Sequence, residues 1–245
     1  MCKNSYQREV ARWLTQSLGL TLYTQILGEI MEKTILLVDD HAVVRQGLKS
    51  LLNQWGYRVV AEADSGEVAI LQNQEHKPSL IIMDLDMPGM GGLEAMQRII
   101  QRQKNIKILV YSMHDDNIYA LRAMQAGARG YVVKSDDINI LVDAVDKVFK
   151  GERFIGRKIA EHLAIDLMNE NNKPLEKLAP REFEVFRQLA VGNSLDTIAE
   201  SLNISYKTVA NIQTAIRQKL DVKTTANLVH LAIQLGVTQS KASIK

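Results

Sequence analysis

Three aspartates in this chain stand where a cluster of carboxylates could form. Asp39 and Asp40 follow one short apolar run, and Asp84 follows another. Ser112 and Lys134 end two further runs of the same kind. Such runs are typical of buried parallel strands, and an open α/β sheet binds its ligands beyond the carboxyl ends of its strands. We therefore expect three carboxylates, a hydroxyl and an amine to converge at one edge of a sheet.

This set of groups suits metal-assisted phosphoryl transfer. Mg²⁺ takes one or two carboxylates, a backbone carbonyl, waters and a phosphate oxygen, and a carboxylate such as Asp84 can be a nucleophile toward phosphorus. Lys134 would balance the phosphoryl charge and Ser112 would donate a hydrogen bond to it. Singly, each feature has a plainer explanation, such as a helix cap, a surface lysine or a turn. The ordered combination favours the active-site interpretation.

The constellation resembles the receiver domain of two-component response regulators. The resemblance is carried by Asp39-Asp40, Asp84 with Met87-Pro88-Gly89 after it, Ser112, and Gly130-Tyr131-Val132-Val133-Lys134. It implies that Asp84 is the phosphoacceptor and that Mg²⁺ is the cofactor. The implied metal ligands are Asp39, Asp40, Asp84 and the backbone carbonyl of Asp86, and the implied switch and phosphate-binding residues are Ser112, Tyr131 and Lys134. The Asp86 side chain and His114 lie where the family tunes phosphoryl lifetime.

Length and composition limit the class of protein. A chain of 245 residues suits two domains and buries a core without disulfides. Its single cysteine, Cys2, fits a reducing compartment, and no apolar stretch approaches the roughly 18–20 residues of a membrane span. We therefore expect a cytoplasmic protein without a membrane partner.

Strand and helix patterns alternate over residues 33–150. We expect strands near 33–38, 57–62, 79–84, 107–112 and 130–133, and helices near 42–55, 66–76, 92–103, 116–127 and 137–149. Five parallel strands with intervening helices predict a doubly wound α/β sheet, which the resemblance makes a flavodoxin-like receiver domain.

Residues 1–32 form an extension ahead of the first strand. Met31 stands where receiver-like chains usually begin, so one interpretation makes it the natural initiator and residues 1–30 upstream sequence read in frame. The alternative is an amphipathic helix that docks on a partner.

A linker over 151–174 leads to an all-α domain over 175–240. The linker holds a short predicted helix over 155–164 and a polar stretch that ends at Pro174. The sequence pattern of this domain predicts helices over 180–191, 195–202, 205–220 and 224–235, with Ser205 as an N-cap. The tight turn at Asn203-Ile204 predicts a helix-turn-helix, in which the second helix enters the major groove.

This domain resembles the LuxR-type module of NarL/FixJ response regulators, and the linker resembles the GacA branch. The module's signature lies in Leu178-Ala179-Pro180-Arg181-Glu182, Ile198-Ala199-Glu200-Ser201-Leu202, Ile204-Ser205, Lys207-Thr208-Val209 and Lys219-Leu220. The DNA-binding residues implied are Ser205, Lys207, Thr208, Ala210, Asn211, Gln213, Thr214, Arg217 and Lys219. The family usually has Lys and His where Ala210 and Ile212 stand, so the recognition helix has less positive charge and fewer phosphate contacts. Asn211 and Gln213 can still contact adenine edges.

These observations predict a DNA-binding transcriptional response regulator that is switched by phosphorylation of Asp84. The resemblance implies a sensor histidine kinase, a homodimer formed through 224–235, and promoter DNA as partners. Two other classes stay open: a phosphorylation-dependent interaction protein without specific DNA binding, and a multiple-turnover phosphatase or phosphotransferase. The absence of a separate substrate domain argues against an enzyme. On pattern alone, 175–237 could be a generic helical bundle, but the full signature behind a receiver disfavours that alternative.

Overall fold

A parallel β-sheet forms the framework of the first half of the chain. The computed structural model describes residues 33–115, 117–161, 174–235 and 237. Its strands are β1 (Thr34–Val38), β2 (Arg58–Ala63), β3 (Leu80–Met83), β4 (Lys107–Ser112), β5 (Gly130–Val133) and β6 (Phe154–Ile155). Their order across the sheet is β2-β1-β3-β4-β5-β6, and every neighbouring pair is parallel.

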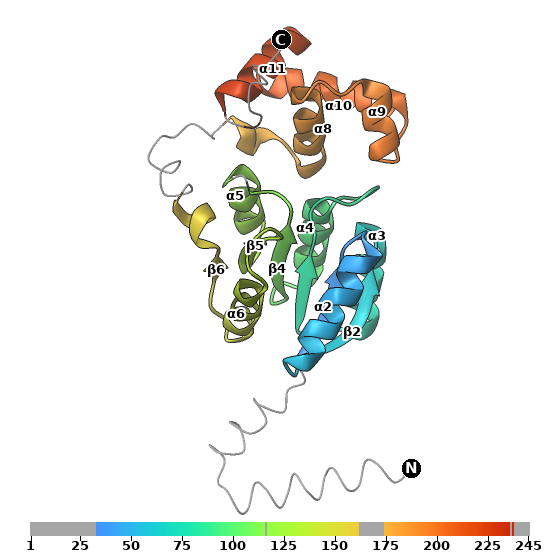
Figure 1. Cartoon of the computed structure of the whole chain (residues 1–245). Helices are drawn as coiled ribbons and strands as arrows, with labels where there is room; N and C mark the ends of the chain where they lie inside the picture. Colours follow the sequence, from blue (N-terminus) through green and yellow to red (C-terminus); the bar gives the residue numbers. More distant parts are fainter. Residues whose placement is uncertain (1–32, 116, 162–173, 236, 238–245) are drawn as a thin grey trace, which may run out of the picture. The chain divides into compact units, whose positions relative to one another are not determined.

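Helices cover both faces of this sheet (Figure 1). They are α2 (Ala42–Gln54), α3 (Gly66–His76), α4 (Gly92–Arg102), α5 (Asn117–Gln125) and α6 (Ile138–Phe149). Strand residues alternate between two apolar clusters, because successive side chains of a strand point to opposite faces. Ile35 and Leu37 pack with side chains of α2 and α6, whereas Leu36 and Val38 pack with side chains of α3, α4 and α5. The sheet is therefore doubly wound, as the sequence predicts.

The sixth strand corrects the prediction of five. β6 has only two residues, and it pairs Phe154 with Gly130 and Ile155 with Tyr131. A strand of two residues is too short to show a hydrophobic period, so it has no recognisable signal in the sequence. The helix predicted over 155–164 is wrong at its start, since Ile155 is in a strand, and residues 157–161 are helical. The rest of that range lies outside the described residues, as does the whole of residues 1–32.

The order of the strands creates a crevice between β1 and β3. The chain moves from β1 to β2 on one side and then returns past β1 to β3, so the connections leave the sheet in opposite directions at this point. Such a switch point is where open α/β sheets bind ligands. Val38 is paired with Met83, so the residues that follow them, Asp39 and Asp84, leave the sheet side by side.

The second half of the described chain is helical. After a short 3-10 turn (Leu175–Lys177) come α8 (Pro180–Ala190), α9 (Leu195–Ser201), α10 (Tyr206–Lys219) and α11 (Thr225–Gln234). Three of these helices begin at a hydroxyl N-cap: Ser194, Ser205 and Thr224 each accept a hydrogen bond from a backbone N–H in the first turn. Asn203 adopts φ 51° in the turn between α9 and α10, a conformation that asparagine tolerates better than most residues.

An apolar core joins these four helices. Its fully buried members include Phe183 and Phe186 of α8, Ile198 of α9, Ile216 of α10 and Leu228 of α11. α8 contacts both α10 and α11, and α9 contacts α10. No helix among the described residues is long and apolar enough to cross a membrane.

Candidate functional site

Backbone hydrogen bonds fix the site residues just beyond the ends of the strands. Asp39 N donates to Ala63 O at 3.1 Å, and Asp84 N donates to Val38 O at 2.8 Å. Lys134 N donates to Ser112 O at 2.8 Å. Each of these bonds continues the ladder by one residue, so the side chains that follow the strands project from a rigid edge.

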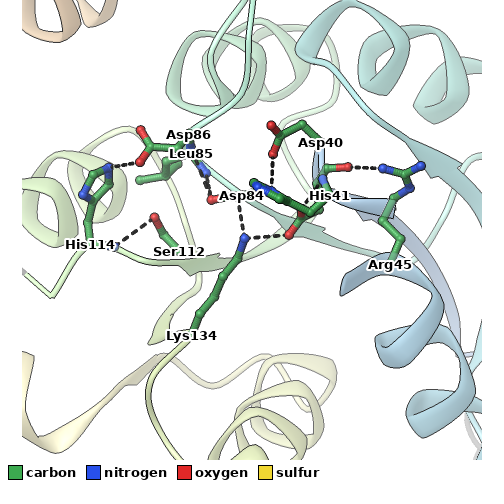
Figure 2. Close-up of polar contacts among 10 residues, drawn as sticks. Asp40, His41, Arg45, Asp84, Leu85, Asp86, Ser112, His114 and Lys134 are labelled. Atoms are coloured by element: carbon green, nitrogen blue, oxygen red, sulfur yellow. Dashed lines mark hydrogen bonds and ion pairs between the residues drawn. The ribbon is translucent and has the colours of Figure 1, made fainter. Parts of the chain in front are cut away.

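Lys134 joins two of the three predicted carboxylates. Its Nζ donates to Asp39 Oδ2 at 2.6 Å and to Asp84 Oδ2 at 2.5 Å (Figure 2). The three side chains are only 7%, 4% and 2% exposed, respectively. Burial alone would lower the pKa of Lys134, but its bonds to the two carboxylates outweigh burial and raise the pKa. The amine is therefore a fixed positive charge in the crevice.

Asp84 is held from its other side by the loop after β3. Its Oδ1 accepts hydrogen bonds from Leu85 N at 2.7 Å and Asp86 N at 3.3 Å. Burial raises the pKa of the Asp84 carboxyl, and the Lys134 hydrogen bond and charge oppose that rise only in part. Gly92, the first residue of α4, lies so close that an added Cβ would come within 1.9 Å of Asp84 O. A glycine at this position lets α4 begin directly against the loop.

The acidic residues have the chemistry of a divalent cation site. Asp39, Asp40, His41 and Asp84 each offer one ligand atom, and these four atoms lie within 4.8 Å of one another. Asp40 Oδ1 is buried and makes no hydrogen bond among the described residues; the polar atom in contact with it is His41 Nδ1, 2.8 Å away. A carboxylate oxygen that makes no hydrogen bond, beside two other carboxylates, fits Mg²⁺, which prefers hard oxygen ligands. Sequence reasoning missed His41, although its place directly after the acidic pair was a signal for it.

The remaining predicted receiver residues gather around β4 and β5. Ser112 is fully buried, and its Oγ accepts a hydrogen bond from His114 N at 3.3 Å. Tyr131 is also fully buried and donates from its hydroxyl to His114 O at 2.9 Å. The His114 ring lies 2.6 Å from Asp86 Oδ2. Burial would raise the pKa of the Asp86 carboxyl, but its hydrogen bond and charge interaction with His114 lower it.

The predicted DNA-contacting residues lie on α10 and at its N-cap. Ser205 caps the helix, with its Oγ accepting from Thr208 N at 3.1 Å. Five of the predicted side chains are exposed on the helix: Lys207, Thr208, Asn211, Thr214 and Lys219. Ala210, Gln213 and Arg217 are half-buried. Tyr206, the first residue of α10, is 53% exposed and was not among the predicted residues.

Some polar groups of α10 are engaged within the domain. Lys219 Nζ donates to Glu182 Oε2 of α8 at 2.6 Å. Gln213 donates to Thr225 Oγ1 at 3.4 Å, and Thr214 donates to Ala210 O at 3.0 Å. A phosphate contact by Lys219 would require its ion pair to open, whereas Lys207, the other exposed basic side chain of this helix, is in no ion pair with another described residue.

Comparison with known proteins agrees with a phosphoryl-accepting domain followed by a helix-turn-helix domain. The family described as "Response regulator receiver domain" matches residues 35–146, and "Bacterial regulatory proteins, luxR family" matches residues 176–232. The transcriptional activator protein ExaE of Pseudomonas putida is 40% identical over 212 residues, which cover 85% of this chain and 99% of ExaE. The chain belongs to the LuxR-type response regulators.

Other members of this family are similar over the same span. The response regulator UvrY of Escherichia coli is 34% identical over 210 residues, covering 84% of this chain and 96% of UvrY. Among solved structures, RcsB of Salmonella enterica, bound to promoter rprA in the presence of the phosphomimetic BeF₃⁻, is 25% identical with a TM-score of 0.57. That likeness covers 84% of this chain and all of the RcsB chain, 100%.

Proposed function

We propose that this response regulator accepts a phosphoryl group on Asp84 and that the modified chain regulates transcription by binding promoter DNA. One observation carries the proposal. A buried carboxylate, Asp84, is hydrogen-bonded to a buried lysine, and both lie beside an acidic pair with a carboxylate oxygen that makes no hydrogen bond. That combination has a direct use in phosphoryl transfer, whereas a buried ion pair is by itself weak evidence for a stabilising role.

The transfer step needs only a nucleophile, a donor and fixed charges. A carboxylate oxygen of Asp84 attacks the phosphorus of a phosphohistidine or a small acyl phosphate, forming a new P–O bond. The P–N or P–O bond of the donor breaks, and its electron pair leaves with the donor. Mg²⁺ would be held by Asp39, Asp40, Asp84 and the backbone carbonyl of Asp86, and when bound it supplies neutralisation of the phosphoryl oxygens.

Three residues would respond to the new charge. Lys134 is already charged in the crevice and would pair with a phosphoryl oxygen, and Ser112 would donate its hydroxyl to another. Tyr131 is the third, and its side chain already occupies the buried position that we expect of the phosphorylated state. Phosphorylation would thus shift a population between two arrangements of the loops after β4 and β5.

The helix-turn-helix would supply the output. The RcsB complex with a promoter gives a precedent within the family for DNA binding by this architecture. We propose that α10 enters the major groove, with Lys207 on a phosphate and Asn211 at a base edge. The family pairs its output domains through the last helix, here α11, so two copies would bind two half-sites. A sensor histidine kinase would be the phosphoryl donor.

A second function is favoured by two observations on α10. Its Lys219 is paired with Glu182, and the position that is usually Lys in the family holds Ala210. A phosphorylation-dependent protein-interaction regulator without specific DNA binding therefore stays a candidate, because lost phosphate contacts lower DNA affinity.

Phosphoryl incorporation tests the receiver chemistry. Incubation with a small acyl phosphate and Mg²⁺ should add one phosphoryl group per chain, detected as an intact-mass increase that hydroxylamine removes. The Asp84→Asn variant should show none. Continuous release of phosphate without a stable adduct would instead indicate a multiple-turnover phosphatase.

A further inference from the structure

His41 lies beside the carboxylates of the acidic pocket. It follows Asp40 directly and precedes α2, where its backbone N donates to Asp39 Oδ1 at 2.8 Å. Its ring Nδ1 lies 2.8 Å from Asp40 Oδ1 and 3.4 Å from Asp39 Oδ1. Figure 2 shows the ring beside Asp40 and Asp84, within the group of acidic side chains. The ring does not cap α2.

The contact between His41 and Asp40 has the spacing of two ligands of one ion. Asp40 Oδ1 has no hydrogen-bond partner among the described residues, although His41 Nδ1 is 2.8 Å away. Adjacent ligands of an octahedral ion with bonds of about 2.1 Å lie about 3 Å apart. The two groups are thus in direct contact, and both belong to the four ligand atoms that lie within 4.8 Å of one another.

Imidazole changes which ions such a pocket prefers. Carboxylate, carbonyl and water suit Mg²⁺, whereas imidazole suits first-row transition metals, whose affinities rise along the series from Mn²⁺ to Cu²⁺. We propose that His41 Nδ1 is a metal ligand, so that the Asp84 pocket binds a first-row divalent transition metal ion as well as Mg²⁺. This inference rests on the proposed function, because it concerns the ion of the same pocket.

The His41 side chain is exposed, so that a metal ion from solvent can reach it. Its side chain is 68% exposed, whereas that of Asp39 is 4% exposed, so an ion that enters from solvent meets the imidazole at the rim of the pocket. His41 is positioned by its backbone bond to Asp39, and its side chain is free to adjust to the ion. A change at His41 should therefore alter the choice of metal with little effect on folding.

A metal-selectivity experiment tests the proposal on the full chain. The metal-free protein is titrated with Co²⁺ and, separately, with Mg²⁺, and only the Co²⁺ that excess Mg²⁺ displaces is counted. His41→Ala should weaken this Co²⁺ binding by about tenfold or more and leave Mg²⁺ binding within about twofold. His76→Ala is the matched control, because His76 is an exposed residue in the last turn of α3, outside the pocket.

A spectroscopic arm identifies the ligand atom. Mn²⁺ bound to the wild type should show ¹⁴N modulation of its electron spin echo, and this signal should be absent in His41→Ala and present in His76→Ala. If His41 is instead a protonated partner of the carboxylates, its removal will strengthen binding of both ions, and the proposal is wrong. The proposal would also be wrong if His41→Ala weakened Co²⁺ and Mg²⁺ binding equally, or if its ¹⁴N modulation were the same as that of the wild type.

The failure of this inference can be distinguished from failure of the proposed function. If the protein takes up one phosphoryl group with Mg²⁺ but shows no ¹⁴N modulation, the phosphoacceptor proposal stands and the imidazole-ligand proposal is wrong. If the protein shows ¹⁴N modulation but is never phosphorylated, the metal-ligand proposal stands and the proposed phosphorylation switch is wrong.

Discussion

Replacement of Lys134 by methionine should expose the electrostatic cost of the phosphoacceptor crevice. Asp39 and Asp84 would lose their common cation, and their ligand oxygens lie within 4.8 Å of each other. Two like charges at that separation repel by roughly 3.5 kcal/mol or more at an effective dielectric constant of about 20. Removing one partner of a buried ion pair typically costs about 3–5 kcal/mol. We expect the free energy of unfolding to fall by about this amount in metal-free buffer.

Urea unfolding with and without millimolar Mg²⁺ measures this effect. Mg²⁺ should restore more stability to Lys134→Met than it adds to the wild type, because the variant pocket is more negative and binds the cation more tightly. Lys147→Met is the control, since its exposed partner Asp143 lies one helical turn away at 2.9 Å. Loss of this exposed ion pair should lower the free energy of unfolding by less than about 1 kcal/mol.

At mildly acidic pH, the difference in free energy of unfolding between Lys134→Met and the wild type should also become smaller. The folded-state pKa of Asp84 already lies above its unfolded value, and loss of Lys134 would raise it further. Since a raised carboxyl pKa destabilises the folded state as pH rises above the unfolded value, the deficit should shrink at mildly acidic pH. A variant as stable as the wild type in metal-free buffer at neutral pH, or equally responsive to Mg²⁺, would refute the reasoning.

Four further substitutions test other parts of the structure. Gly92→Ala should destabilise the chain by at least about 1–3 kcal/mol and slow phosphorylation, because its Cβ would meet a backbone oxygen at 1.9 Å. Gly47→Ala, in an open position of α2, should instead stabilise by up to about 1 kcal/mol, and equal effects in urea unfolding would contradict both expectations. Tyr57→Phe should cost roughly 1.5–3 kcal/mol by removing the 2.6 Å bond to Asp146. Burial raises the pKa of Tyr57, so wild-type stability should decline above pH ~10, and a variant with the same alkaline decline would exclude Tyr57 as its source. Lys207→Ala should weaken DNA binding across sequences and reduce the slope of log affinity against log salt by about one; an unchanged slope would remove Lys207 from the phosphate contacts.

The location of the site could be predicted because its signals are local. Each site residue follows an apolar run of a buried strand, and parallel strands bring those ends to one edge regardless of distance along the chain. Asp84 and Lys134 are 50 positions apart, yet both were predicted to lie in the crevice. The position of Ser205 as an N-cap was predictable for the same reason, since its partner is three residues away.

Other features depend on packing that the sequence does not encode locally. β6 is a pair of residues that becomes a strand only because the edge of β5 is available to it. The ion pair between Lys219 and Glu182 forms because α8 packs on α10, and neither residue's neighbours in sequence indicate it. The approach of the His41 ring to Asp40 depends on a side-chain direction at the start of α2.

DNA binding with and without an acyl-phosphate donor is the most direct test of the proposed switch. The full chain and Asp84→Asn would be titrated onto a DNA pool selected with the phosphorylated protein, in Mg²⁺ at constant salt. We expect the donor to increase wild-type affinity and to leave Asp84→Asn unchanged. Equal binding in all four conditions, or a donor effect that persists in Asp84→Asn, would contradict phosphorylation of Asp84 as the switch.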